Sequence, residues 1–363
     1  MHKKQILILI LVFNWLATTI ANNDTISSGK SFFLIPHIAY QQETNWSAGI
    51  AYGYYFNSKD ISRISSISGS ATYTLQNQFL FNITPKLYFA DKKWFVYANL
   101  NFRNYPDYYY GIGNKPTHLK IAYTSQNFNF NIQPQYQLSE KLYIGALVAL
   151  KTEKIHSDSS LSIIEQEIYN QFGSDGWTNY KQYFVGLIGN YDSRDNQFYP
   201  SKGVFIKAIS SFSPQISFNS YALFDYSIDF RKYFSLPKNQ VLAFQTYTSG
   251  MFGKSGIPFQ LLPTLGGRDV MRGYRQGMYR DNILITAQTE YRFPIYKRLK
   301  AALFCSAGDV MNSSDMKVDK LKVAYGAGLR YRLNDARVHL RFDIAKNNYG
   351  EKLQFYITAT EAF

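Results

Sequence analysis

The feature that most constrains the fold of this chain is a strict alternation of apolar and polar residues. In residues 127–133 three apolar side chains alternate with amides, and in residues 337–344 every second residue is charged or an imidazole. Successive side chains of a β-strand point to opposite faces, so this period of two predicts strands with one apolar and one polar face. Helical periodicity is nearly absent; we expect its one candidate, residues 161–172, to lie in a loop.

Two kinds of protein accommodate such strands. A soluble sandwich buries the apolar faces in a core, whereas a membrane barrel turns them to lipid and keeps polar groups in its lumen. The start of the chain favours the barrel. Lys3 and Lys4 precede an apolar run at 6–13, and a small-residue cleavage site ends at Ala21. This pattern predicts a secretory signal peptide over residues 1–21, because the apolar run is short for a transmembrane anchor.

The composition fits an exported membrane barrel. Aromatic residues make up 17% of the chain, including 31 Tyr and 28 Phe, and barrels place such rings at both membrane–water interfaces. The formal net charge of +14 is scattered and forms no basic block. We therefore expect outer-membrane lipid and lipopolysaccharide as partners, and no nucleic acid. Cys305 is the single cysteine, so no internal disulfide is possible.

The alternation predicts an all-β fold, a 16-stranded antiparallel transmembrane β-barrel over residues 31–363, after a short periplasmic tail at 22–30. An even number of strands returns both termini to the same side of the membrane. The predicted strands are 31–41, 46–57, 64–75, 79–90, 93–104, 118–137, 141–154, 179–192, 203–213, 217–232, 239–252, 283–293, 299–308, 322–332, 336–346 and 352–361.

The predicted connections alternate in length. Links that follow even-numbered strands have ten residues or fewer, whereas the long connections 105–117, 155–178, 253–282 and 309–321 all follow odd-numbered strands. Short periplasmic turns and long extracellular loops are typical of outer-membrane barrels. The segment 253–282 is therefore predicted to be an extracellular loop.

No constellation for catalysis or metal binding is visible, so we expect no enzyme, no cofactor and no metal. The histidines are scattered, and neither a nucleophile elbow nor a phosphate-binding loop occurs. Asp192 and Asp195 flank Arg194 and could act as a general acid and base. Their neighbours Asn196, Pro200 and Gly203 are turn residues, which favours a polar turn.

The long loop 253–282 carries the most distinctive motif, Met271-Arg272-Gly273-Tyr274. The loop contains six glycines and an apolar stretch, so we expect it to pack inside the lumen. Arg272 then needs a carboxylate, and alternation along the next strand turns Glu290 toward the lumen together with Gln288 and Arg292. We expect a bidentate Arg272–Glu290 pair. The alternative is an exposed arginine and an unrelated glutamate.

At these residues the chain resembles the BamA/TamA-type surface-antigen barrels, a group that includes the transporters of two-partner secretion. In that family a Val/Ile-Arg-Gly-Tyr/Phe motif on the sixth extracellular loop folds back into the lumen, and a glutamate at the position of Glu290 follows it. The family also has a Phe-x-Asp-x-Gly motif whose aspartate contacts the loop arginine. Here the motif reads Phe304 to Gly308 with Ser306 at the aspartate position, so the resemblance implies that one charge partner is missing.

Further matches lie at the turn 191–203 and at the strands that contain Gly326-Ala327-Gly328 and Arg341-Phe342-Asp343. By resemblance, Phe363 is the terminal aromatic of an outer-membrane targeting strand, with Phe355 and Ile357 on the same face. The family's seam between the first and last strands opens sideways. Pro36 in the first strand would weaken that seam, or is simply tolerated at an edge.

The resemblance implies a bacterial outer-membrane protein that inserts or translocates other proteins. Family members carry periplasmic POTRA domains that receive clients. Since only residues 22–30 separate the signal peptide from the first strand, we expect a member reduced to its barrel, with a separate periplasmic chain delivering clients. The alternative function is a small-solute channel or a structural surface barrel without translocase activity. The client is not indicated by the residues.

Overall fold

The computed structural model describes residues 30–41, 45–56, 63–75, 77–115, 121–156, 179–216, 219, 221–254, 256–334, 336–350, 352–359 and 361–363. The predicted signal peptide, nearly all of the periplasmic tail and the candidate helical stretch 161–172 lie outside the described residues. Among the residues described, no helix is long and apolar enough to cross a membrane.

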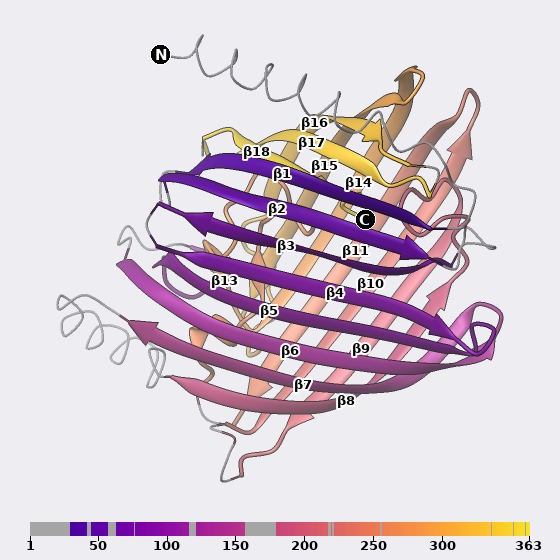
Figure 1. Ribbon diagram of the computed structural model, residues 1–363. Coiled ribbons are helices and arrows are strands. Elements are labelled where there is room, and N and C mark those ends of the chain that lie inside the picture. Colours follow the sequence, from indigo (N-terminus) through magenta and orange to yellow (C-terminus); the bar gives the residue numbers. More distant parts are fainter. Residues whose placement is uncertain are drawn as a thin grey trace.

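Sixteen antiparallel strands in the described residues form one sheet that curls around a lumen (Figure 1). Each strand pairs with its neighbours along this series. The strands are β1 (Ser31–Gln41), β2 (Asn45–Phe56), β3 (Ser65–Thr74), β4 (Phe79–Phe89), β5 (Trp94–Tyr109), β6 (Ile121–Ser139), β7 (Leu142–His156), β8 (Tyr180–Asp192), β9 (Gly203–Ser213), β10 (Leu223–Leu236), β11 (Gln240–Gly253), β14 (Ile283–Tyr296), β15 (Leu299–Met311), β16 (Lys322–Arg332), β17 (His339–Asn347) and β18 (Gln354–Ala359). The predicted all-β, sixteen-stranded barrel is confirmed.

The two faces of the wall differ as the alternation predicted. Along β10, Phe224, Ile228 and Phe230 are exposed on the outer face. Along β14, Gln288, Glu290 and Arg292 are buried on the inner face. Apolar side chains on an outer surface suit contact with lipid, because a soluble protein rarely exposes so many of them together.

The connections at the two rims differ in length. The turns after β4, β6, β10 and β14 are short, and the connection from β11 to β14 is long. Several predicted boundaries at the long-loop rim were wrong: β10 begins at Leu223 instead of 217, and β15 ends at Met311 instead of 308. Strand β5 continues to Tyr109 instead of ending at 104, because Tyr105 to Tyr109 pair with the first residues of β6.

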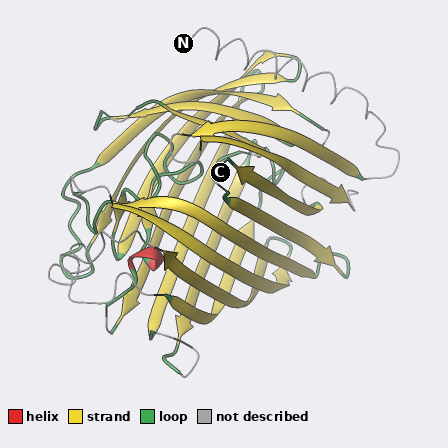
Figure 2. Cartoon of the chain, turned by 60° about the vertical axis from the view of Figure 1, so that its left-hand side comes forward, coloured by secondary structure: helices red, strands yellow, loops and turns green. Residues whose placement is uncertain are grey.

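The segment 253–282, called the inward loop below, turns back into the barrel. It contains the short helix η1 (Phe259–Leu261) and a two-stranded ribbon of β12 (Thr264–Leu265) and β13 (Tyr279–Arg280). Figure 2 shows η1 in red, with loop segments inside the curve of the sheet. The inward folding of this loop agrees with the sequence expectation.

The sheet has two ends, β1 and β18, and no hydrogen-bonded ladder joins them in the described part of the chain. Pro36 lies on β1 opposite Ile50 of β2, so it occupies an edge strand. Strand β18 is short and pairs with β17 over only Gln354–Ala359.

The position expected for Phe363 was wrong. Phe355 and Ile357 point outward from β18 and are 60% and 61% exposed, but Phe363 is 2% exposed. It lies inside the barrel and packs with Tyr233 of β10 and Ala243 of β11. The strand ends at Ala359, so the residues after it leave the alternating pattern, and the terminal aromatic ring is buried in the lumen instead of facing lipid.

Candidate functional site

The inward loop lies across the lumen and contacts the wall through three clusters of buried side chains, one of which joins Leu261 to β7, β8, β10 and β11. At one side, Phe259 and Leu262 pack with Tyr109 of β5 and Tyr123 of β6. At the other side, a second group of buried side chains joins the loop to β14, β15 and β16. This group comprises Leu265, Met271, Tyr274, Tyr279, Leu284, Val310 and Ala324. Burial of these three apolar clusters holds the loop in place, since removing such surface from water is the main favourable term in packing.

The tip of the loop, Gly273, lies against the last strands of the barrel. Its N–H donates to the hydroxyl of Tyr356 on β18 at 3.0 Å, and its carbonyl oxygen accepts from the amide of Asn347 on β17 at 2.8 Å. The neighbouring Tyr274 hydroxyl donates to the Asn348 side-chain oxygen at 2.5 Å. The tip is therefore bonded to strands beside the seam.

A glycine is required at this tip for two reasons. Gly273 has a φ of +104°, which side chains with a Cβ rarely adopt. A Cβ would also lie 3.0 Å from the Cβ of Ala324 and 3.1 Å from the carbonyl oxygen of Lys346. The Arg-Gly-Tyr triplet thus places a residue without a side chain where the loop approaches the wall.

We expect Gly273→Ala to lower the free energy of unfolding of the barrel by about 3 kcal/mol, because it combines backbone strain with a steric conflict. Gly267→Ala is the matched control. Gly267 also has a positive φ, +91°, but a Cβ there would meet only the flexible Gln276 side chain, so a loss of about 1 kcal/mol is expected. Denaturant unfolding in detergent micelles measures both; equal losses would contradict the close packing of the tip.

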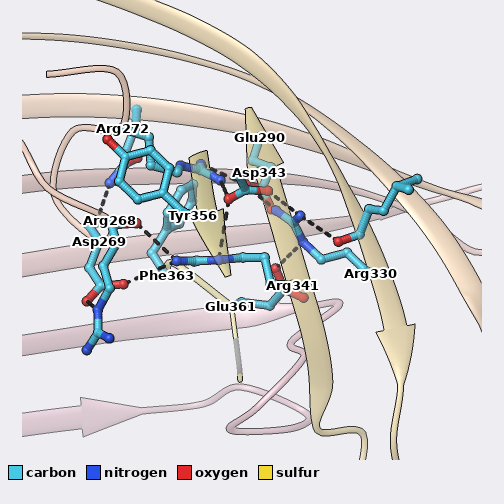
Figure 3. A network of polar contacts seen from close by, with 12 residues as sticks. Arg268, Asp269, Arg272, Glu290, Arg330, Arg341, Asp343, Tyr356, Glu361 and Phe363 are labelled. Atoms are coloured by element: carbon cyan, nitrogen blue, oxygen red, sulfur yellow. Dashed lines mark hydrogen bonds and ion pairs between the residues drawn. The ribbon is translucent and has the colours of Figure 1, made fainter. Parts of the chain in front are cut away.

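The guanidinium of Arg272 is fully buried and contacts two carboxylates on different strands (Figure 3). Its Nη2 lies 2.7 Å from Oε2 of Glu290 on β14, and its Nη1 donates to Oδ2 of Asp343 on β17 at 2.7 Å. The ring of Phe304 on β15 lies beneath it, 3.5 Å from centroid to guanidinium carbon. The expected pair with Glu290 is present, but it is not bidentate: Arg272 divides its contacts between two carboxylates.

Three further wall arginines complete a guanidinium–carboxylate network with Arg272, Glu290, Asp343 and Glu361. Arg292 donates to Glu290 at 2.7 Å. Arg330 of β16 bonds Glu290, Asp343 and, at 2.7 Å, Glu361, which follows β18. Arg341 lies 3.3 Å from Asp343. The network therefore joins the inward loop, β14, β16, β17 and the C-terminal residues.

The charges of this network nearly cancel. Four buried guanidinium groups face three buried carboxylates, and Asp269 of the inward loop, which is half exposed, adds a fourth carboxylate 3.4 Å from Arg341. Taking an isolated charge out of water is costly, so buried cations persist only with such partners. Removing one member should therefore destabilise the contacts of several others.

Ser306, at the position of the aspartate in the motif that the chain resembles, makes no hydrogen bond to Arg272. The serine is buried on β15 opposite Gln288, and its hydroxyl has no hydrogen-bond partner. Asp343 of β17 supplies a carboxylate to Arg272 instead. Room for Asp343 comes from Gly328 on the paired strand β16, because a Cβ on Gly328 would overlap the carboxylate. Arg272 thus keeps two carboxylate partners.

The other predicted site residues are distributed as follows. Met271 is fully buried in the cluster between the inward loop and the wall. Gly308 lies on β15 between Thr286 and Lys322 of the neighbouring strands. Pro36, Phe355 and Ile357 lie on the two end strands of the sheet and do not join the network. Phe363 approaches it, since its main-chain oxygen accepts a hydrogen bond from Arg292 at 2.9 Å.

The sequence did not predict that Arg330, Arg341, Asp343 and Glu361 belong to the network around Arg272. The alternation in residues 337–344 places Arg341 and Asp343 on the inner face of their strand. It does not show which residues of other strands they contact. A second buried pair, Lys322 with Asp309 at 2.5 Å, was also missed. Lys322 follows the inner-face alternation of β16, but Asp309 falls out of the inner-face register of β15, in which Phe304, Ser306 and Gly308 are buried, so alternation does not predict this pair.

The polar side chains of the turn between β8 and β9 bond to other groups of the same turn. Arg194 makes two contacts with Asp192, at 2.9 Å and 2.7 Å. Asp195 accepts from the main-chain N–H of Ser201 and of Lys202 at 2.7 Å and 3.0 Å, and from the Ser201 hydroxyl at 2.6 Å. Both carboxylates are thus engaged in holding the turn, as the turn interpretation predicted. In the described residues no group of three or more potential ligands could hold a metal ion.

Asp195 makes the stability of this turn dependent on pH. Burial alone would raise the pKa of its carboxyl, but hydrogen bonds from Ser201 and Lys202, with the charge of Arg337, outweigh burial and lower the pKa. A depressed pKa contributes stability above the unfolded pKa of about 4, and that contribution is lost as the pH falls further. We expect Asp195→Asn to lower the unfolding temperature at pH 7, with the difference from wild type shrinking below pH 4.

The control for this measurement is Asp91→Asn, in the exposed turn between β4 and β5. That substitution should leave the unfolding temperature nearly unchanged at both pH values. If the unfolding temperatures of Asp195→Asn and wild type differed by the same amount at every acid pH, a lowered pKa for Asp195 would be contradicted.

The Omp85 superfamily domain matches residues 63–363 of this chain. Among solved structures, BamA from Haemophilus ducreyi lacking POTRA domains 1–3 is similar, with a TM-score of 0.59 and 14% identity over 92% of this chain and 70% of that one. CdiB from Acinetobacter baumannii is similar with a TM-score of 0.54 and 11% identity over 91% of this chain and 59% of that one. The chain thus spans less than two thirds of the CdiB chain. No curated protein matches it in sequence.

Proposed function

The chain belongs to the Omp85 superfamily of bacterial outer-membrane β-barrels, and we propose that it takes part in inserting proteins into the outer membrane or translocating them across it. The proposed role is not enzymatic. The barrel binds a client protein and lets it pass into or across the outer membrane, and no covalent bond of the client is broken. Its lipid partners are the outer-membrane lipids and lipopolysaccharide that surround the apolar outer face. A separate periplasmic chain delivers the client.

The observation that carries this proposal is the attachment of the inward loop to the last two strands, β17 and β18. Gly273 bonds Tyr356 of β18, and Arg272 bonds Asp343 of β17. Strand β18 is short, and no ladder joins it to β1 in the described residues. A loop bound there can hold the last strands in position while the β1–β18 edge stays available for pairing with a client strand, since unpaired strand edges recruit further strands.

The occupied lumen also bears on the alternative function. A sixteen-stranded barrel has room for an aqueous channel, but here the inward loop and Phe363 lie within it. A steady small-solute channel requires an open path, so the internal packing favours the insertion and translocation role over a channel.

The proposal is tested in cells depleted of this protein and complemented with wild type, Arg272→Ala or Arg268→Ala. Arg268 lies on the same loop, but its side chain is 65% exposed, so it is the matched control. We expect depletion to lower the folded level of at least one other outer-membrane or surface protein, and wild type and Arg268→Ala to restore it. Unchanged levels of every such protein after depletion would refute the proposal.

A further inference from the structure

A basic cavity lies at the short-turn rim of the lumen, on the far side of the guanidinium–carboxylate network from the inward loop's tip. Its volume is about 400 Å³, within the range of ligand-binding sites. The turns after β10 and β14, the ends of β15, β16 and β17, and the segment before β9 surround it. Its basic side chains are Lys297, Arg298, Lys300, Arg332 and Arg337. We call this cavity the vestibule.

The side chains that line the vestibule carry an excess of positive charge. No carboxylate lines it in the part of the chain that the structure describes. Arg337 has an ion pair with Asp195 at 3.2 Å, the charge of Glu361 acts on Lys300, and Lys300 lies 3.9 Å from the ring centroid of Tyr199. Several cations around one hollow focus a positive potential there, which attracts anionic groups.

Two buried polar groups in the vestibule wall lack partners. The Tyr199 hydroxyl and Nε2 of His339 are buried and make no hydrogen bond, and both residues are at most 2% exposed. Nδ1 of His339 bonds the carbonyl oxygen of Arg337 at 2.8 Å, so that nitrogen is the donor and Nε2 is left over. Buried polar groups are nearly always paired; because Nδ1 is the donor, Nε2 is an acceptor that suits a main-chain N–H of a bound peptide, not a carboxylate.

We propose that the vestibule binds an acidic segment of a periplasmic protein. This inference rests on the proposed function, from which the short-turn rim faces the periplasm and a separate chain brings the client. Carboxylates of an extended segment accept hydrogen bonds from Lys300 and Arg332, and the cavity has room for only a few residues. Lys300 and Arg332 lie in the inner-face registers of β15 and β16, away from the surrounding bilayer, which favours a peptide over a lipid headgroup.

The test uses the purified full-length barrel in neutral detergent and a fluorescent oligo-glutamate peptide as the probe. We expect saturable binding that weakens as the salt concentration rises, and no binding of an oligo-lysine peptide of equal length. The double variant Lys300→Gln/Arg332→Gln should bind about a hundredfold more weakly, roughly tenfold for each charge-assisted hydrogen bond removed. Lys238→Gln removes one charge from the same rim but outside the vestibule, and should bind like wild type.

Heat-modifiable gel migration confirms that each variant is folded. If the double variant does not fold, Lys297→Gln replaces it, because Lys297 is exposed in the turn and its loss should still weaken binding. Equal binding by the vestibule variants and Lys238→Gln would overturn the proposal. So would binding of phosphatidylglycerol vesicles through these residues without oligo-glutamate binding. Depletion of this protein could lower the level of a client protein while the purified barrel does not bind the oligo-glutamate peptide. That result would reject the vestibule as a binding site and would leave the proposed function supported.

Discussion

Replacing Arg272 by alanine is expected to lower the free energy of unfolding of the barrel by about 3 kcal/mol or more, in the range measured when one partner of a buried ion pair is removed. Glu290 and Asp343 each lose a contact at 2.7 Å, and the ring of Phe304 loses the guanidinium above it. Denaturant unfolding in detergent micelles measures this loss. Limited proteolysis should show new cleavage within residues 253–282, because the tip of the loop is released.

The matched control for this variant is Arg268→Ala. Arg268 pairs only with its exposed neighbour Asp269 through its side chain, and surface pairs contribute at most about 1 kcal/mol. Its stability and cleavage pattern should therefore stay close to wild type. If Arg272→Ala behaved like Arg268→Ala, the network would not be what holds the inward loop.

The second large effect is expected at Asp343. Asp343→Asn leaves the fully buried Arg341 with only the half-exposed Asp269 as an ionic partner, and it removes one of two carboxylates from Arg272. We expect a loss of about 3–5 kcal/mol. Because Ser306 occupies the position of the family's aspartate, Ser306→Asp in the Asp343→Asn background should restore part of that loss.

A double-mutant cycle compares the effect of Ser306→Asp on stability in wild type with its effect in the Asp343→Asn variant. Ser306→Asp should stabilise the Asp343→Asn variant more than it stabilises wild type, since only the variant lacks a second carboxylate for Arg272. Ser306→Asn, which adds similar bulk without the charge, is the control and should restore nothing. Additive effects of the two substitutions would show that the positions do not substitute for one another.

The fold of this barrel could be predicted from its sequence because apolar and polar residues alternate along its strands. The alternation of apolar and polar residues predicted every strand of the wall. It also correctly predicted that the Glu290 side chain of β14 faces the lumen. The expected contact between Arg272 and Glu290 followed, since a buried cation in a polar lumen needs a carboxylate. These inferences used only the strand containing Glu290 and the connection before it.

The remaining features depend on strands that are distant in sequence. Asp343 reaches Arg272 because β17 curves next to β16, where Gly328 leaves space, and alternation along one strand does not report such a neighbour. The inward turn after Ala359 was missed for a related reason. The apolar pattern of β18 suggests that Phe363 continues the outer face, but Glu361 is bonded to Arg330 in the lumen, and this contact draws the last residues inside.

Arg272 is expected to hold the inward loop in the lumen and thereby to keep the lumen blocked. Planar-bilayer recording of the purified wild type and of Arg272→Ala tests this expectation most directly. We predict that wild type shows no steady large conductance, and that Arg272→Ala, confirmed as folded by heat-modifiable migration, shows long open events with a larger conductance. Steady large conductance from wild type, or indistinguishable recordings from the two proteins, would contradict this expectation.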